Sequence, residues 1–126
     1  MTEQLQKTLE KELSKYNEIE QSIRNYVLSR QQLSTQYAEN KMVREELNHL
    51  KDDAVVYKTI GPLIVQVPLV ESKETVQQRL GYLESELRRV ETILEEAEKK
   101  QIQQQEVIQK IQAQMRAKSP KTSSYR

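Results

Sequence analysis

The stretch from Val56 to Val67, VYKTIGPLIVQV, differs from the sequence on both sides of it. It is apolar and β-branched with a Gly-Pro pair at its centre, whereas its surroundings are charged, rich in Gln and almost free of Gly and Pro. Val, Ile and Tyr favour strands, Gly61 is able to take a positive φ, and Pro62 lacks the N–H that a strand ladder uses. We therefore predict a β-hairpin with strands over 54–58 and 63–67.

The composition outside this stretch is typical of long helices. Of the 126 residues, 31% are charged and 5% are aromatic, all of them Tyr, so one domain without a large globular core is expected. The net charge of +1 predicts no binding to nucleic acid or to membranes. No stretch resembles a signal peptide or a membrane span of about 18 apolar residues, so we expect a soluble, cytoplasmic protein. The absence of Cys excludes disulfides and thiolate metal sites.

Two series of residues with alternating steps of three and four lie on either side of the hairpin. The first ladder consists of Leu9, Glu12, Tyr16, Ile19, Ile23, Tyr26, Arg30, Leu33, Tyr37, Asn40, Arg44 and Leu47. The second ladder consists of Val76, Leu80, Leu83, Leu87, Val90, Leu94, Ala97, Gln101, Gln104, Ile108, Ile111 and Met115. Eight of twelve positions are apolar in the first ladder and ten of twelve in the second. This spacing predicts helices that pack through a heptad seam.

The fold class that follows is mostly α: a long antiparallel two-helix coiled coil with one central β-hairpin. The expected segments are a coiled-coil helix over 1–50, the hairpin insertion over 51–71, a second coiled-coil helix over 72–117 and a disordered basic tail over 118–126. Either a capping box at Thr75 and Gln78 or an N-cap at Ser72 is expected near the start of the second helix. In this antiparallel arrangement facing residue numbers add up to about 123, which places Tyr16 near Val107.

The hairpin is expected to need partners. An isolated two-stranded hairpin is marginally stable in water, and both of its strands are edges that invite pairing with another chain. No other strand-like segment is present in the sequence, and apolar residues occur on both faces of the hairpin. We therefore predict that several chains pool their hairpins into one intermolecular β-barrel or sheet, since closure would remove the edges. The alternative is a hairpin folded back on its own coiled coil, which would cover only one of its faces.

Three stretches carry a resemblance to a known family. They are Glu39–Leu47, ENKMVREEL, then Val56–Val65, VYKTIGPLIV, and Val76–Leu83, VQQRLGYL. Together they resemble the β-class subunits of prefoldin, over about residues 3–117. The single hairpin fits the β class, because the α class carries two hairpins and a longer insertion.

The resemblance implies a heterohexamer of two α-type and four β-type subunits whose hairpins form the barrel. It implies that the complex holds unfolded proteins such as actin and tubulin without ATP and delivers them to the cytosolic chaperonin. The residues expected to form the barrel and to mediate subunit assembly are Val55, Val56, Tyr57, Ile60, Gly61, Pro62, Leu63, Ile64, Val65 and Val67.

Client binding is expected at the free ends of the two helices. The candidate client-binding residues are Leu5, Leu9, Leu13, Tyr16, Val107, Ile108, Ile111 and Met115. For Leu9, Ile108 and Ile111, packing between the two helices is an equally good explanation. The polar ladder residues Glu12, Gln101 and Gln104 are expected to loosen the packing there.

Enzymatic activity is not expected. The sequence has no Gly-rich phosphate loop and one His, His49, which we interpret as a structural or surface residue, so no cofactor, metal or catalytic residue is predicted. A scaffold or tether that dimerises through its hairpin is the alternative function. The apolar residues on both hairpin faces favour the larger assembly.

Overall fold

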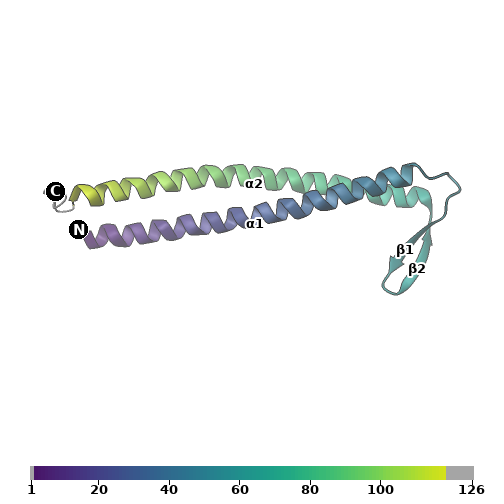
Figure 1. Cartoon of the computed structure of the whole chain (residues 1–126), viewed down its shortest axis with the longest axis horizontal. Helices are drawn as coiled ribbons and strands as arrows, with labels where there is room; N and C mark the ends of the chain where they lie inside the picture. The colour runs from purple at the N-terminus through teal and green to yellow at the C-terminus, as the bar shows by residue number, and fades with distance from the viewer. Residues whose placement is uncertain (1, 119–126) are drawn as a thin grey trace, which may run out of the picture. The chain divides into compact units, whose positions relative to one another are not determined.

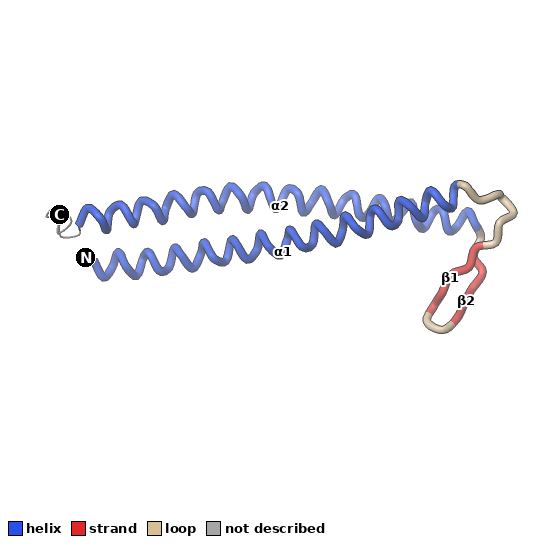
Figure 2. The backbone as a smooth tube through the Cα atoms, viewed as in Figure 1, coloured by secondary structure: helices blue, strands red, loops and turns tan. Residues whose placement is uncertain are grey.

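The structure is a computed structural model that describes residues 2–118. Two long helices, α1 (Thr2–Asn48) and α2 (Leu69–Lys118), flank the strands β1 (Val56–Ile60) and β2 (Leu63–Val67), as Figures 1 and 2 show. The predicted disordered tail lies outside the described residues, except Lys118, which ends α2. The chain divides into two compact units, Met1–Val27 with Thr92–Arg126, here called the terminal unit, and Leu28–Glu91, here called the hairpin unit.

The hairpin closes through a two-residue turn. β1 and β2 pair antiparallel in a register that runs from Val56 opposite Val67 to Ile60 opposite Leu63. Gly61 has a φ of 58° and Pro62 follows it, the arrangement of a type II′ turn, which suits the twist of paired strands. Because this turn takes up only two residues, pairing extends to Ile60, and the first strand covers 56–60 instead of the predicted 54–58.

The second helix begins earlier than either predicted cap. α2 starts at Leu69, and the carbonyl of Pro68 accepts a hydrogen bond of 3.0 Å from the Ser72 N–H. The hydroxyl of Thr75 donates to the Glu71 carbonyl at 3.0 Å, a bond made inside a helix. The expected caps at Thr75 and Ser72 are therefore wrong. Pro68 cannot continue a strand ladder, so the chain changes from strand to helix directly after it.

Both ladders form the buried seam. All twelve positions of each ladder are buried or half-buried, including its polar members. In the hairpin unit the core cluster contains Leu47, Leu69, Val76 and Leu80, and Val56 at the base of β1 packs against it. The spacing of the ladders thus predicted the helix face that is buried in each unit.

The register of the two helices in the terminal unit differs from the predicted one. In the terminal unit, Gln101 reaches Tyr16 and Gln104 reaches Glu12, so the numbers of bonded residues add up to 117 and 116. The prediction that Tyr16 lies near Val107 is therefore wrong by about six residues. In the hairpin unit, where Tyr37 bonds to Glu84 and Arg30 to Glu91, both sums are 121, close to the predicted value.

Candidate functional site

The hairpin presents apolar side chains on both faces. Directly opposite residues of an antiparallel pair share a face, and successive residues alternate. One face therefore carries Ile60 and Leu63, and the other carries Tyr57 and Ile64. Leu63 is 64% exposed and Ile64 is 70% exposed, although side chains of this kind are usually covered. Of the ten predicted barrel residues, only Val56 and Val67 are half-buried in the chain; the rest are exposed.

The edges of the hairpin are also open. The sheet has two strands, so each strand has one neighbour within the described chain. In an antiparallel pair, alternate residues turn their N–H and C=O groups away from the partner strand. Each strand therefore offers backbone groups for pairing with a further strand, and the exposed apolar faces offer the area that such pairing would bury.

A groove of about 390 Å³ runs beside β1. Four consecutive β1 residues, 56–59, line it, and the helices contribute Val43, Leu47 and Val76 together with the charged Glu71 and Arg79.

Further apolar residues near the hairpin were missed by the sequence prediction. Met42, Leu50 and Val70 are 62%, 41% and 67% exposed, although they lie within a few residues of buried positions. None of them belongs to a ladder. The sequence does contain a signal for these three residues: each is apolar, lies off the seam and is close in sequence to the hairpin.

The predicted client-binding residues divide into three groups in the terminal unit, by how far each is exposed. Leu13 and Val107 are exposed, at 40% and 39%. Leu5, Leu9, Tyr16 and Met115 are half-buried. Ile108 and Ile111 are buried at 8% exposure, so in this structure they pack the seam. Ile102, which was outside the predicted set, is 57% exposed and adds to the accessible apolar surface of this unit.

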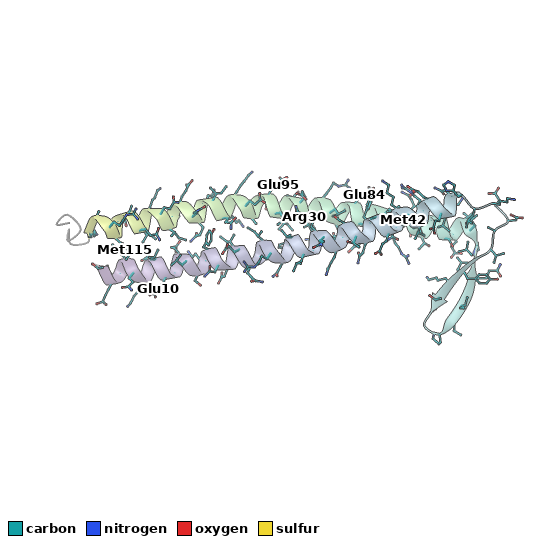
Figure 3. All side chains as sticks on the ribbon, in the orientation of Figure 1. Glu10, Arg30, Met42, Glu84, Glu95 and Met115 are labelled. Carbon is teal, nitrogen blue, oxygen red and sulfur yellow. The ribbon has the colours of Figure 1, made fainter. Side chains whose placement is uncertain are left out.

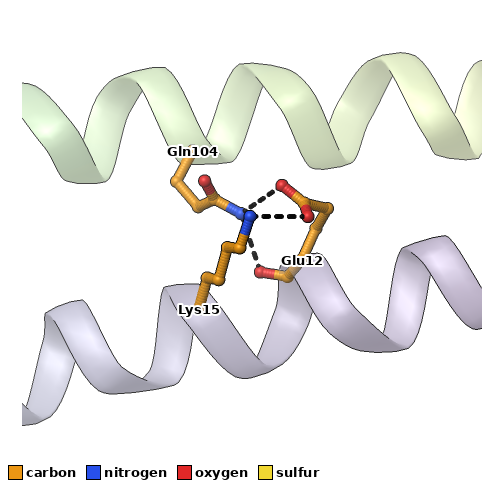
Figure 4. Close-up of polar contacts among 3 residues, drawn as sticks. All are labelled: Glu12, Lys15 and Gln104. Carbon is orange, nitrogen blue, oxygen red and sulfur yellow. Dashed lines mark hydrogen bonds and ion pairs between the residues drawn. The ribbon is translucent and has the colours of Figure 1, made fainter.

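A polar link crosses the seam of the terminal unit (Figure 4). The side-chain N–H₂ of Gln104 donates to the Glu12 backbone carbonyl at 2.8 Å and to Glu12 Oε1 at 3.1 Å. Lys15 Nζ lies 3.2 Å from Glu12 Oε2. The hydrogen bond from Gln104, and then that from Lys15, lowers the pKa of the Glu12 carboxyl below its ordinary value. The prediction that polar residues would loosen the seam is wrong for this pair, because the pair joins the helices.

The hairpin unit has its own polar contacts between helices. The Tyr37 hydroxyl donates to Glu84 Oε1 at 2.9 Å, and Arg30 Nη1 reaches the two Glu91 carboxylate oxygens at 3.2 and 3.3 Å. Arg30 and Glu84 are labelled in Figure 3. The hydrogen bond to Glu84 raises the pKa of Tyr37, because the neighbouring carboxylate favours the protonated phenol. These contacts are positioned to hold the helices in one register.

The described residues contain no cluster of metal ligands. Among residues 2–118 there is no group of three or more His, Asp or Glu side chains suited to a metal ion. His49 Nδ1 lies 2.6 Å from the Glu45 carbonyl oxygen, which also accepts the His49 backbone N–H at 3.2 Å, so the ring is held at the end of α1. No helix within the described residues has the length and apolarity to cross a bilayer.

Comparison with known proteins connects this geometry to a family. A family model described as prefoldin subunit matches residues 10–115. The chain belongs to the prefoldin subunit family. It is 37% identical over 112 residues to prefoldin subunit 6 of Mus musculus, covering 89% of this chain and 88% of that protein. It is likewise 37% identical over 108 residues to prefoldin subunit 6 of Arabidopsis thaliana, covering 86% and 84%.

A solved structure shares the fold of this prefoldin chain. The prefoldin beta subunit from Thermococcus strain KS-1 superimposes with a TM-score of 0.68, at 24% identity, over 90% of this chain and 95% of that one. The predicted resemblance to prefoldin is thus confirmed, as is the mostly helical fold with one antiparallel hairpin.

Proposed function

We propose that the chain is one subunit of a cytoplasmic heterohexameric prefoldin, built from two α-type and four β-type subunits. The complex acts without ATP as a holdase: it captures unfolded proteins, actin and tubulin among them, and delivers them to the cytosolic chaperonin. The chain is not an enzyme in this proposal. The observation that carries it is the hairpin, which is apolar and exposed on both faces and unpaired at both edges within the described chain.

The magnitude of burial supports several partners over one. Tyr57, Ile60, Leu63 and Ile64 are each more than half exposed. Full burial of such a side chain stabilises by about 1.5–3 kcal/mol, so the four together contribute on the order of 10 kcal/mol at most. Association itself costs about 4–15 kcal/mol in lost freedom. A dimer that covers one face buries only two of these side chains, about 6 kcal/mol at most, and is therefore marginal. A closed barrel buries all four and also pairs both edges, which a one-face dimer leaves open.

The ends of the helices in the terminal unit are proposed to hold clients. Leu13, Ile102 and Val107 are accessible to an unfolded chain as they stand. Ile108 and Ile111 become accessible only if the two helices separate locally. Each contact area is small, so affinity is modest per subunit, and several subunits acting on one client raise it through multivalency.

The assembly is tested by the native mass of the complex that the tagged chain forms in a cell lysate. Six chains near the 14.9 kDa of this one give a particle of about 90 kDa. Ile64→Lys is expected to abolish that particle, because it places a charge on the exposed hairpin face. Leu28→Lys, at a 58% exposed helix position, is the matched control and is expected to leave the particle intact. A homodimer of the unaltered chain contradicts the proposal.

Client holding is tested by removing residues 1–16 and 101–126, which takes away Leu13, Ile102 and Val107 together. The shortened chain is expected to assemble normally but to lose suppression of client aggregation, measured by light scattering of a diluted unfolded protein. Unchanged suppression in an intact hexamer contradicts the placement of the holding surface at these ends.

A further inference from the structure

The charges of the chain are divided unevenly along the sequence. Up to Glu106 there are nineteen acidic and fifteen basic residues, so this part is net negative. After Glu106 there are five charged residues, and all five are basic: Lys110, Arg116, Lys118, Lys121 and Arg126. The net charge of +1 therefore hides a negative body and a positive end.

The structure places three of these cations in the terminal unit. Lys110, Arg116 and Lys118 are exposed on α2, and none forms an ion pair with a carboxylate among residues 2–118. Figure 3 labels Met115 in this part of α2. Lys121 and Arg126 lie outside the described residues and add positive charge by sequence alone.

Two of the cations share a helix face with an exposed apolar side chain. Val107, Lys110, Gln114 and Lys118 follow one another in steps of three and four, so they lie along one face of α2. All four are exposed. We call these four residues the basic face. The basic face thus presents the apolar side chain of Val107 together with the cations Lys110 and Lys118, and it lies beside the buried seam residue Ile111.

The preference of cations for the end of a helix does not account for this face. Arg116 and Lys118 lie in the last turn of α2, where positive charge is favoured by the helix dipole. Lys110 lies two turns earlier, and the dipole effect falls off within one turn. The start of α1 does not neutralise the positive charge of the basic face either. Residues 2–11 have no net charge, because the two acidic residues Glu3 and Glu10 are balanced by Lys7 and Lys11.

We propose that the basic face binds acidic segments of unfolded proteins. An apolar side chain of the segment packs on Val107 while its carboxylates approach Lys110 and Lys118. The inference rests on the proposed holdase function and specifies the class of client segment that this subunit prefers. Charge complementarity supports it, because every charged residue after Glu106 is basic and none of the three described ones forms an ion pair within the described residues.

The test measures binding of two fluorescein-labelled unfolded peptides to the assembled complex by anisotropy. The peptides have the same length and the same apolar residues, with Glu at every polar position in one and Lys in the other. The complex is expected to prefer the Glu peptide by about tenfold at an ionic strength of about 0.01 M. The preference should shrink at about 0.15 M, where the Debye length falls from about 30 to about 8 Å.

The variant Lys110→Glu with Lys118→Glu is expected to abolish or reverse the preference. The matched control is Lys99→Glu with Lys100→Glu, which changes net charge equally at exposed positions of α2 in the same unit. The control should keep the preference, and native mass and circular dichroism check that both variants assemble and fold.

The inference is overturned if the unaltered complex binds both peptides with equal affinity. It is also overturned if both variants lose the preference for the Glu peptide equally. Either outcome leaves the holdase proposal standing. Failure of the unaltered complex to bind either peptide overturns both.

Discussion

Replacing Gly81 by Ala is expected to stabilise the chain. Gly81 lies inside α2, is exposed, and has no positive φ; a Cβ added there meets nothing within 4 Å. Gly in a helix interior is about 0.8–1.0 kcal/mol less favourable than Ala, because more backbone freedom is lost on folding. For 126 residues, a gain of about 1 kcal/mol in the free energy of unfolding raises the thermal midpoint by about 4 °C.

The same chemical change at Gly61 is the control and is expected to act in the opposite direction. A Cβ at Gly61 also meets nothing within 4 Å, but its φ of 58° is unfavourable for an L-residue by about 1–2 kcal/mol. Both variants are compared with the unaltered chain by thermal unfolding, followed by circular dichroism at the helix signal. A lowered midpoint for Gly81→Ala in the assembled complex refutes the reasoning, since it means that something outside this chain approaches Gly81 closely.

Two further perturbations test the seam. The pKa of Glu12 is lowered because the hydrogen bonds from Gln104 and Lys15 favour its charged form. The stability that Glu12 contributes is therefore fully present above its unfolded-state pKa. It is lost as the pH falls through the folded-state pKa. Glu12→Gln should flatten the dependence of the thermal midpoint on pH in the acidic range, and an unchanged pH profile contradicts this. Leu80→Ala, at a position 1% exposed, should lower the free energy of unfolding by about 2–5 kcal/mol in a denaturant titration, whereas Leu28→Ala, 58% exposed, should change it by less than about 0.5 kcal/mol. Similar losses in the two variants contradict the burial assigned to the second ladder.

The sequence alone determined the elements of this protein and the faces that they bury. Helices were readable because a step of three and four residues returns a side chain to the same face, a signal contained within each segment. The turn was readable because Gly61 and Pro62 each restrict the backbone in a way that a neighbouring residue does not. The apolar faces of the hairpin were readable from Tyr57, Leu63 and Ile64, since they have no partner strand elsewhere in the sequence.

Only the tertiary structure decided how these elements meet. The register of the two helices is not contained in the heptad spacing, which is the same for any shift by a whole repeat. Whether Gln104 weakens or joins the seam depends on finding Glu12 opposite it, 92 residues away in sequence. These are relations between distant segments, which a local pattern of residues does not contain.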